Sequence, residues 1–246
     1  MPHAPLPPSA AERWIACPSS RQAETEAPPT VLSAFADLGT HAHELFARGL
    51  RLGLAIEALT TDPAIRQPLA LALAAMREIL GPRTFMVEIR LPALAGLPAL
   101  WGTADVVGFS LPGPADTIAD LKFGKAILVE ADTPQLGVYA VLAARCYGVA
   151  EGGITAWTIQ PRYDHADGLA RRHHYSRDAL DQLEVRLREA AAATLVPNAP
   201  RRAGPWCRWC RAAATCPVRQ AMPDAVPPTV SGWFRPTPRW LTAARA

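Results

Sequence analysis

The chain contains 246 residues, of which 50% are hydrophobic and 19% charged, and its formal net charge is +3. This length and composition suffice for one large domain and exclude a disordered chain, a collagen-like chain and a short disulfide scaffold. The sequence has neither an apolar run long enough to span a membrane nor a recognisable secretory signal. We therefore expect a cytoplasmic protein with no membrane partner, in which cysteines are reduced or bind metal.

The positive charge of the chain comes almost entirely from arginine. Of the 25 basic residues, only Lys122 and Lys125 are lysine. Two lysines three residues apart in such a chain indicate a role that arginine cannot fill. The small net charge does not by itself indicate a nucleic-acid partner.

Helices are predicted from apolar periodicity and from capping residues. A capping-box spacing, Ser9 to Glu12, predicts the start of a short helix that ends near Cys17, and a polar loop follows to about Thr30. Pro134 in the first helical position, after Thr133, predicts a further helix start. The expected helices span residues 9–17, 33–54, 63–80, 134–147 and 176–195.

Strands are predicted where short apolar runs lie between turn signals. The segment Leu111–Pro114 is a strong turn signal and predicts that the strands on either side of it form a hairpin. The expected strands span residues 84–91, 100–109, 117–122, 153–160 and 172–175.

This order of elements predicts an α/β fold with a mixed central sheet flanked by helices. Residues 1–8 are rich in proline and are expected to be flexible, residues 9–219 to form the domain, and residues 220–246 to form an irregular proline-rich tail.

Three polar residues interrupt two strands that should otherwise be apolar. Asp120 and Lys122 are two residues apart, so they point to the same face of their strand, and the hairpin would bring Asp105 beside them. Two carboxylates can bind a hard divalent cation, with the lysine close to its water or substrate. Such a site suits phosphodiester hydrolysis, although an Asp–Lys pair alone could equally be a surface ion pair.

Two helices carry further candidates. His43 is in register with apolar residues three and seven positions later, so it is expected to face inward, either as a core residue or as a metal ligand. Gln135 and Tyr139 are four residues apart and share one helix face.

These features together resemble the RecB-type branch of the PD-(D/E)XK nuclease superfamily. The resemblance rests on Gly39-Thr40-x-x-His43-Glu44, Gly102-x-x-Asp105, Asp120-x-Lys122 and Gln135-x-x-x-Tyr139, in that order. It implies a restriction-endonuclease-like core, a Mg²⁺ or Mn²⁺ site and a catalytic lysine. The implied metal ligands are His43, Asp105 and Asp120; the implied catalytic or auxiliary residues are Asp105, Asp120, Lys122, Gln135, Tyr139 and, as an assisting residue, Glu88.

The cysteines suggest a second metal site. Cys207, Cys210 and Cys216 form a C-x₂-C-x₅-C pattern, and Cys17 lies far upstream, whereas Cys146 is expected to be a core residue. Four thiolates could hold zinc or an iron–sulfur cluster, and the spacing alone does not choose.

The same arrangement is similar to that of iron–sulfur RecB-type nucleases, such as the AddB-like and CRISPR-adaptation exonuclease-like groups and small phage or prophage members. That resemblance implies a [4Fe–4S] cluster joining the two ends of the domain. The expected function is a Mg²⁺- or Mn²⁺-dependent deoxyribonuclease, an exonuclease in phage or prophage DNA recombination or processing. The expected partners are DNA with free ends or single strands and a recombination or helicase protein. The alternative is a catalytically inactive DNA-binding protein stabilised by a metal cluster.

Overall fold

The computed structural model describes residues 4–28, 34–110 and 113–222. The helices of this part of the chain are α1 (Ala11–Ala16), α2 (Ser20–Glu26), α3 (Ala34–Leu52), α4 (Pro63–Leu80), α5 (Pro134–Tyr147), α6 (Arg177–Ala193) and α7 (Pro217–Gln220). Four short 3₁₀ helices accompany them: η1 (Pro8–Ala10), η2 (Ile56–Ala58), η3 (Pro205–Trp209) and η4 (Ala213–Thr215). None of the described helices is both long and apolar enough to cross a membrane.

The centre of the molecule is a five-stranded mixed sheet in the order β1-β2-β3-β4-β5. Its strands are β1 (Thr84–Leu91), β2 (Gly102–Phe109), β3 (Ala115–Leu121), β4 (Ile154–Ile159) and β5 (Ala170–Tyr175). Strands β3 and β4 are parallel and are joined through α5, whereas the other neighbours are antiparallel. The predicted mixed α/β sheet and the β2–β3 hairpin are confirmed, although Leu111 and Pro112 of the expected turn lie outside the described residues.

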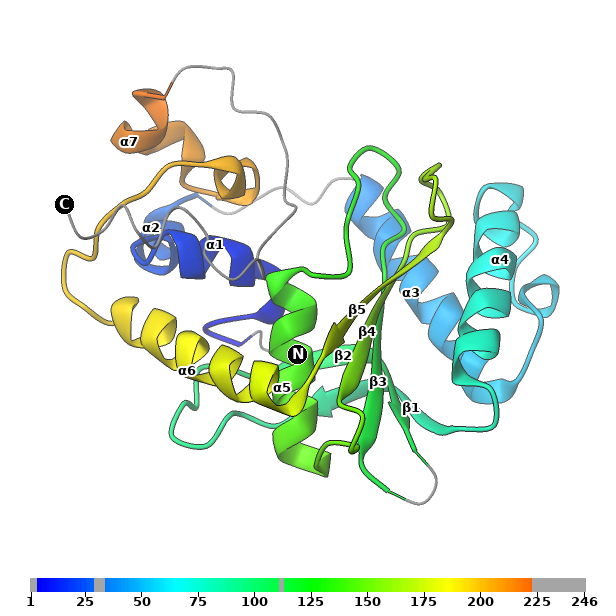
Figure 1. Cartoon of the computed structure of the whole chain (residues 1–246). Helices are drawn as coiled ribbons and strands as arrows, with labels where there is room; N and C mark the ends of the chain where they lie inside the picture. The colour runs from blue at the N-terminus through cyan, green and yellow to red at the C-terminus, as the bar shows by residue number, and fades with distance from the viewer. Residues whose placement is uncertain (1–3, 29–33, 111–112, 223–246) are drawn as a thin grey trace.

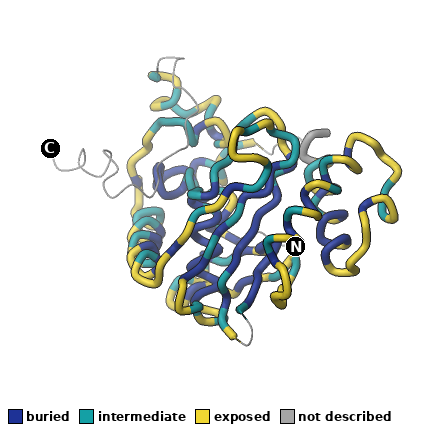
Figure 2. The backbone as a smooth tube through the Cα atoms, turned by 45° about the vertical axis from the view of Figure 1, so that its right-hand side comes forward, coloured by how far each residue is buried: buried dark blue, intermediate teal, exposed yellow. Residues whose placement is uncertain are grey.

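Helices cover both faces of the sheet (Figure 1). Helices α3 and α4 lie on one face, and α1, α5 and α6 lie on the other. The central strands are largely buried, and exposed residues gather in the outer helices and loops (Figure 2). A sheet covered on both faces needs apolar residues on both sides of its strands, so polar residues inside these strands require a specific explanation.

The described part of the amino-terminal segment, residues 4–8, packs against the domain. Leu6 is 2% exposed within the core, and its backbone N–H donates to Ala99 O at 3.0 Å. Trp14 of α1 extends this packing, since its Nε1 donates to Pro7 O at 3.1 Å. Two buried apolar side chains therefore hold a segment whose many prolines suggested a loose end. The expected tail beyond Met222 lies outside the described residues.

Three local predictions were wrong. Ser9 is not a helix cap, because it lies inside η1 and no side chain caps α1. The expected loop after Pro18 contains α2, which packs against α1. Cys146 is exposed rather than buried, because the last turn of α5 presents it on the outer side of the helix.

Candidate active site

Three carboxylates lie level with one another on three neighbouring strands. The antiparallel register of β1 with β2 places Glu88 level with Asp105, and that of β2 with β3 places Asp105 level with Asp120. Asp105 and Asp120 are buried, at 8% and 2% exposure, whereas Glu88 is exposed on the edge strand. Carboxylates gathered in this way repel one another unless cations or donors offset their charge.

The backbone of β1 is distorted at the first of these carboxylates. Glu88 has φ +52°, in the left-handed region, and the β1–β2 pairing is interrupted at this residue. A non-glycine residue in this region costs on the order of 1–3 kcal/mol, and such strain gathers at functional sites. Burial and the nearby charge of Asp105 raise the pKa of Glu88.

Helix α3 brings His43 to the same place, as its inward register predicted. Its Nδ1 lies 3.2 Å from Asp105 Oδ2, and the same carboxylate oxygen accepts a hydrogen bond from Leu121 N at 2.7 Å. Burial opposes the charged imidazole, but the hydrogen bond and the charge of Asp105 outweigh it and raise the pKa of His43 to about 9. The site is thus strongly electronegative and attracts cations.

The side chains of His43, Glu88 and Asp105 form the candidate metal site. One potential ligand atom from each lies within 4.8 Å of the other two, and this is the only such group of three among the described histidine, cysteine and acidic residues. One imidazole nitrogen and carboxylate oxygens suit Mg²⁺ or Mn²⁺. Glu88, expected only to assist, therefore lies in this group, whereas Asp120 lies beside it.

Asp120 belongs to a network with Lys122 and Gln135. Gln135 Nε2 donates to Asp120 Oδ1 at 2.7 Å, and Lys122 Nζ donates to Gln135 Oε1 at 2.7 Å. Lys122 Nζ also forms an ion pair with Asp120 Oδ2 at 2.7 Å. Burial raises the pKa of Asp120, and Lys122 offsets part of that rise. The ammonium group therefore compensates part of the charge of this buried carboxylate.

Tyr139 of α5 contacts this network through Gln135. It is 6% exposed, and its hydroxyl group shares a hydrogen bond with Gln135. Burial and the charge of Asp120 raise the pKa of Tyr139 strongly, so its phenol stays protonated. Gly102 allows Pro8 and Tyr139 to pack closely against β2, because a Cβ atom at this position would lie 2.5 Å from Pro8 Cγ and 2.9 Å from Tyr139 Cε1.

The polar row continues across the two remaining strands, which the sequence did not reveal. Thr158 of β4 is level with Asp120, and Arg171 of β5 is level with Thr158. Both are buried, at 0% and 5% exposure, and their side chains donate to backbone oxygens of the loop between β3 and α5. A threonine and an arginine in separate strands become noticeable only once the strand order is known.

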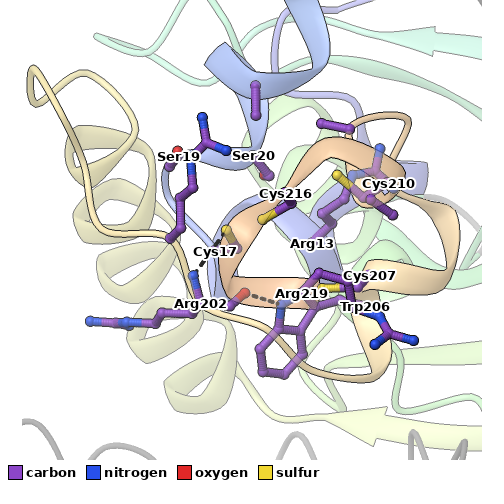
Figure 3. Close-up of a pocket in the computed structure, with 14 residues that line it drawn as sticks. Arg13, Cys17, Ser19, Ser20, Arg202, Trp206, Cys207, Cys210, Cys216 and Arg219 are labelled. Atoms are coloured by element: carbon purple, nitrogen blue, oxygen red, sulfur yellow. Dashed lines mark hydrogen bonds between the residues drawn. The ribbon is translucent and has the colours of Figure 1, made fainter. Parts of the chain in front are cut away.

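The four predicted cysteine ligands line one pocket, formed between the start of the domain and its last helices (Figure 3). Cys17 follows α1, Cys207 lies in η3, and Cys210 and Cys216 flank η4. The chain ends of the domain, about 190 residues apart in sequence, therefore meet here.

Several donors point at the thiols. Arg202 N donates to Cys17 Sγ at 3.3 Å, and Gly204 N donates to Cys207 Sγ at 3.4 Å. Burial raises the pKa of the Cys17 thiol. Burial also acts to raise the pKa of Cys216, but donors from Arg219 and Arg201 outweigh it and lower that pKa. Such N–H groups stabilise sulfur that carries negative charge.

Comparison with known proteins gives a family and solved structures to which the chain is similar. A search of curated proteins gives no match. The fold is similar to the crystal structure of SSO0001, with 17% identity over 87% of this chain and 85% of that chain and a TM-score of 0.42. The sequence matches the family described as "Protein of unknown function (DUF2800)" over residues 3–226, and the chain belongs to that family.

Proposed function

We propose that this protein is a metal-dependent deoxyribonuclease that hydrolyses phosphodiester bonds, with a core of the PD-(D/E)XK type. The observation that carries the proposal is the convergence of His43, Glu88 and Asp105 within 4.8 Å, next to a lysine held by a carboxylate and an amide. Paired carboxylates for a cation, beside a lysine that can face a phosphate, are the minimal groups for this hydrolysis.

A divalent cation fits the donors that the site offers. His43, Glu88 and Asp105 would hold it, and Asp120, level with Asp105 in the next strand, pairs with Lys122. When bound, the cation would act as a Lewis acid that lowers the pKa of water and screens charge on the phosphate. The raised pKa of His43 reflects the same surplus of negative charge.

Lys122 supplies a compact positive charge at a fixed place. Its ammonium group is held between Asp120 and Gln135, so its position is set before substrate arrives. There it can orient a water molecule and stabilise negative charge on the reacting phosphate. Gln135 links the carboxylate and the lysine, and Tyr139 positions Gln135.

The choice of substrate follows from the family resemblance of the four motifs. We propose DNA with free ends or single strands, cut exonucleolytically during phage or prophage recombination or processing. Because the sequence has no phosphate-binding Walker loop, a partner such as a helicase would supply any unwinding.

We further propose that the four cysteines bind a [4Fe–4S] cluster. The four cysteines line one pocket, so a single metal centre could join them. Their pattern along the chain resembles that of iron–sulfur RecB-type nucleases, which supports a cluster over a zinc ion. The N–H groups directed at Cys17 and Cys207 suit cluster-bound thiolates.

Cleavage of end-labelled DNA tests the proposed activity. Purified protein is incubated with single- and double-stranded DNA in Mg²⁺, Mn²⁺, Ca²⁺ or excess EDTA, beside the variant Asp105→Asn. The amide oxygen that this change leaves at the position could still accept from Leu121 N, so the fold should persist while a metal ligand is lost. We expect cleavage in Mg²⁺ or Mn²⁺ and a loss of at least about 100-fold in the variant.

The other outcomes separate the alternatives. Full cleavage in EDTA, or by Asp105→Asn, would refute the metal-dependent mechanism. DNA binding without cleavage under every condition would favour the inactive DNA-binding protein, and neither binding nor cleavage would refute both.

A further inference from the structure

The loop between β3 and α5, residues 122–133, begins with Lys122 and leads to the helix that carries Gln135. The second lysine of the chain, Lys125, lies exposed in this loop. Within the described part of the chain, no hydrogen bond or ion pair involves its ammonium group. The activity proposed above does not use this residue.

A buried glutamine fixes the backbone on both sides of that lysine. Gln160 is 1% exposed, and its Nε2 donates to Gly124 O at 3.1 Å and to Ile127 O at 2.7 Å. Its Oε1 accepts from Val129 N at 3.1 Å. One side chain therefore binds three backbone groups of the loop and brackets Lys125.

A buried arginine reinforces this anchor. Arg171 donates to Val129 O at 2.8 and 3.2 Å and to Gln160 Oε1 at 2.6 Å. Burial of a guanidinium group is unfavourable unless its donors are satisfied. Two buried side chains, Arg171 and Gln160, therefore hold a loop whose lysine, Lys125, is exposed to solvent.

A second cation lies at the base of the same loop. The guanidinium of Arg162, two residues after Gln160, stacks over the Phe123 ring at 4.9 Å from its centroid. Gly124 beside it is exposed, and a Cβ atom there would meet nothing within 4 Å. Open space next to two cations leaves room for a phosphate chain to approach the backbone.

We propose that Lys125, with Arg162 at the base of the same loop, binds the sugar–phosphate backbone of the DNA strand that enters the active site, and that Gln160 and Arg171 hold the loop that carries Lys125 in position. This inference rests on the nuclease function proposed above. A lysine ammonium binds phosphate as a compact point charge. Fixing the loop before binding lowers the entropy lost when the strand is captured.

Salt-dependent DNA binding tests the proposal. The affinity for a short fluorescein-labelled single strand is measured in Ca²⁺ at several salt concentrations. Lys125→Met should weaken binding by about fivefold. It should also reduce the slope of log K against log salt by about 0.7, the value for one lost phosphate contact on a single strand. Lys125→Arg should keep the slope, because the positive charge remains.

Two further variants make the test specific. Arg66→Met removes an exposed charge on α4, outside this loop, and should change neither affinity nor slope. Gln160→Ala should weaken binding as Lys125→Met does, and the double variant should be no worse than either alone, since both changes remove one contact.

Each remaining outcome counts against the proposal. If wild-type protein binds DNA but Lys125→Met keeps the affinity and the slope, Lys125 does not contact phosphate. Equal losses in Arg66→Met would indicate general charge attraction instead. If wild-type protein neither binds nor cuts DNA, the proposed nuclease function falls together with this inference.

Discussion

Replacement of Gly102 by alanine should destabilise the protein at the floor of the candidate active site. The new Cβ would lie 2.5 Å from Pro8 Cγ and 2.9 Å from Tyr139 Cε1, closer than real Cβ contacts come. Pro8 is a rigid ring in η1, and Tyr139 is buried in α5. Neither can withdraw without displacing the segment that carries it.

Overpacking of this kind costs about 1–3 kcal/mol of unfolding free energy. In a chain of this size, 1 kcal/mol corresponds to about 2–4 °C in Tm, so the variant should melt about 2–12 °C lower. Because Tyr139 contacts Gln135, the variant should also cleave DNA more slowly at saturating substrate. Urea unfolding and a cleavage assay measure the two effects.

Gly39→Ala is the matched control, because Gly39 belongs to another of the four motifs. It lies inside α3, and a Cβ atom there would meet nothing within 4 Å. Alanine in an open helix position should stabilise the protein by about 0.5–1 kcal/mol. The two glycine variants should thus shift stability in opposite directions. If Gly102→Ala unfolds at the wild-type urea concentration, the close packing of the amino-terminal segment on β2 is wrong.

Lys122→Arg should abolish most cleavage in the end-labelled DNA assay. The lysine ammonium lies 2.7 Å from both Asp120 Oδ2 and Gln135 Oε1, and a broad guanidinium cannot take the same place. Cleavage at the wild-type rate would contradict this reasoning. The His43 pKa of about 9 in the fold lies above its ordinary 6.5, so its contribution to stability is complete below pH 6.5 and is lost as pH rises through 9. Metal-stripped protein should therefore lose stability over that range in urea unfolding, and a parallel loss in His43→Gln would refute the assignment. Cys17→Ser should remove the iron and the broad visible absorption of anaerobically purified protein, whereas Cys146→Ser, at an exposed position, should not. Zinc in place of iron would contradict the cluster type.

The sequence predicted best those elements whose ends carry their own capping residues. The Asp62 side chain accepts from Ala64 N and caps α4 at Pro63, and Thr133 caps α5 at Pro134, so both predicted helix starts are confirmed. Helix α2 was missed because its residues are mostly polar and follow a proline. Local signals define helix ends well, but they say little about a short polar helix held by its neighbours.

The candidate site was predictable in part. Spacing placed Asp105, Asp120 and Lys122 together, since strand periodicity and hairpin register are simple rules. Gln135 was assigned to the site only through the family resemblance. The left-handed backbone at Glu88 was not predictable, because no glycine marks it. Glu88 lies in the ligand group because β1 pairs with β2 on both sides of it, and this pairing is known only from the structure.

The polar row across the sheet explains why this fold tolerates its most unfavourable groups. Asp120, Thr158 and Arg171 are all nearly inaccessible, and apolar residues at such positions would often give a more stable protein. The acidic part of the row gathers the candidate metal ligands and fixes Lys122. The other part, Thr158 and Arg171, binds the loop that begins with Lys122 and leads to the helix carrying Gln135. Both halves of the row therefore fix the same short stretch of chain. The buried charges of the row are better explained by their placing this lysine-bearing segment than by a contribution to the stability of the fold.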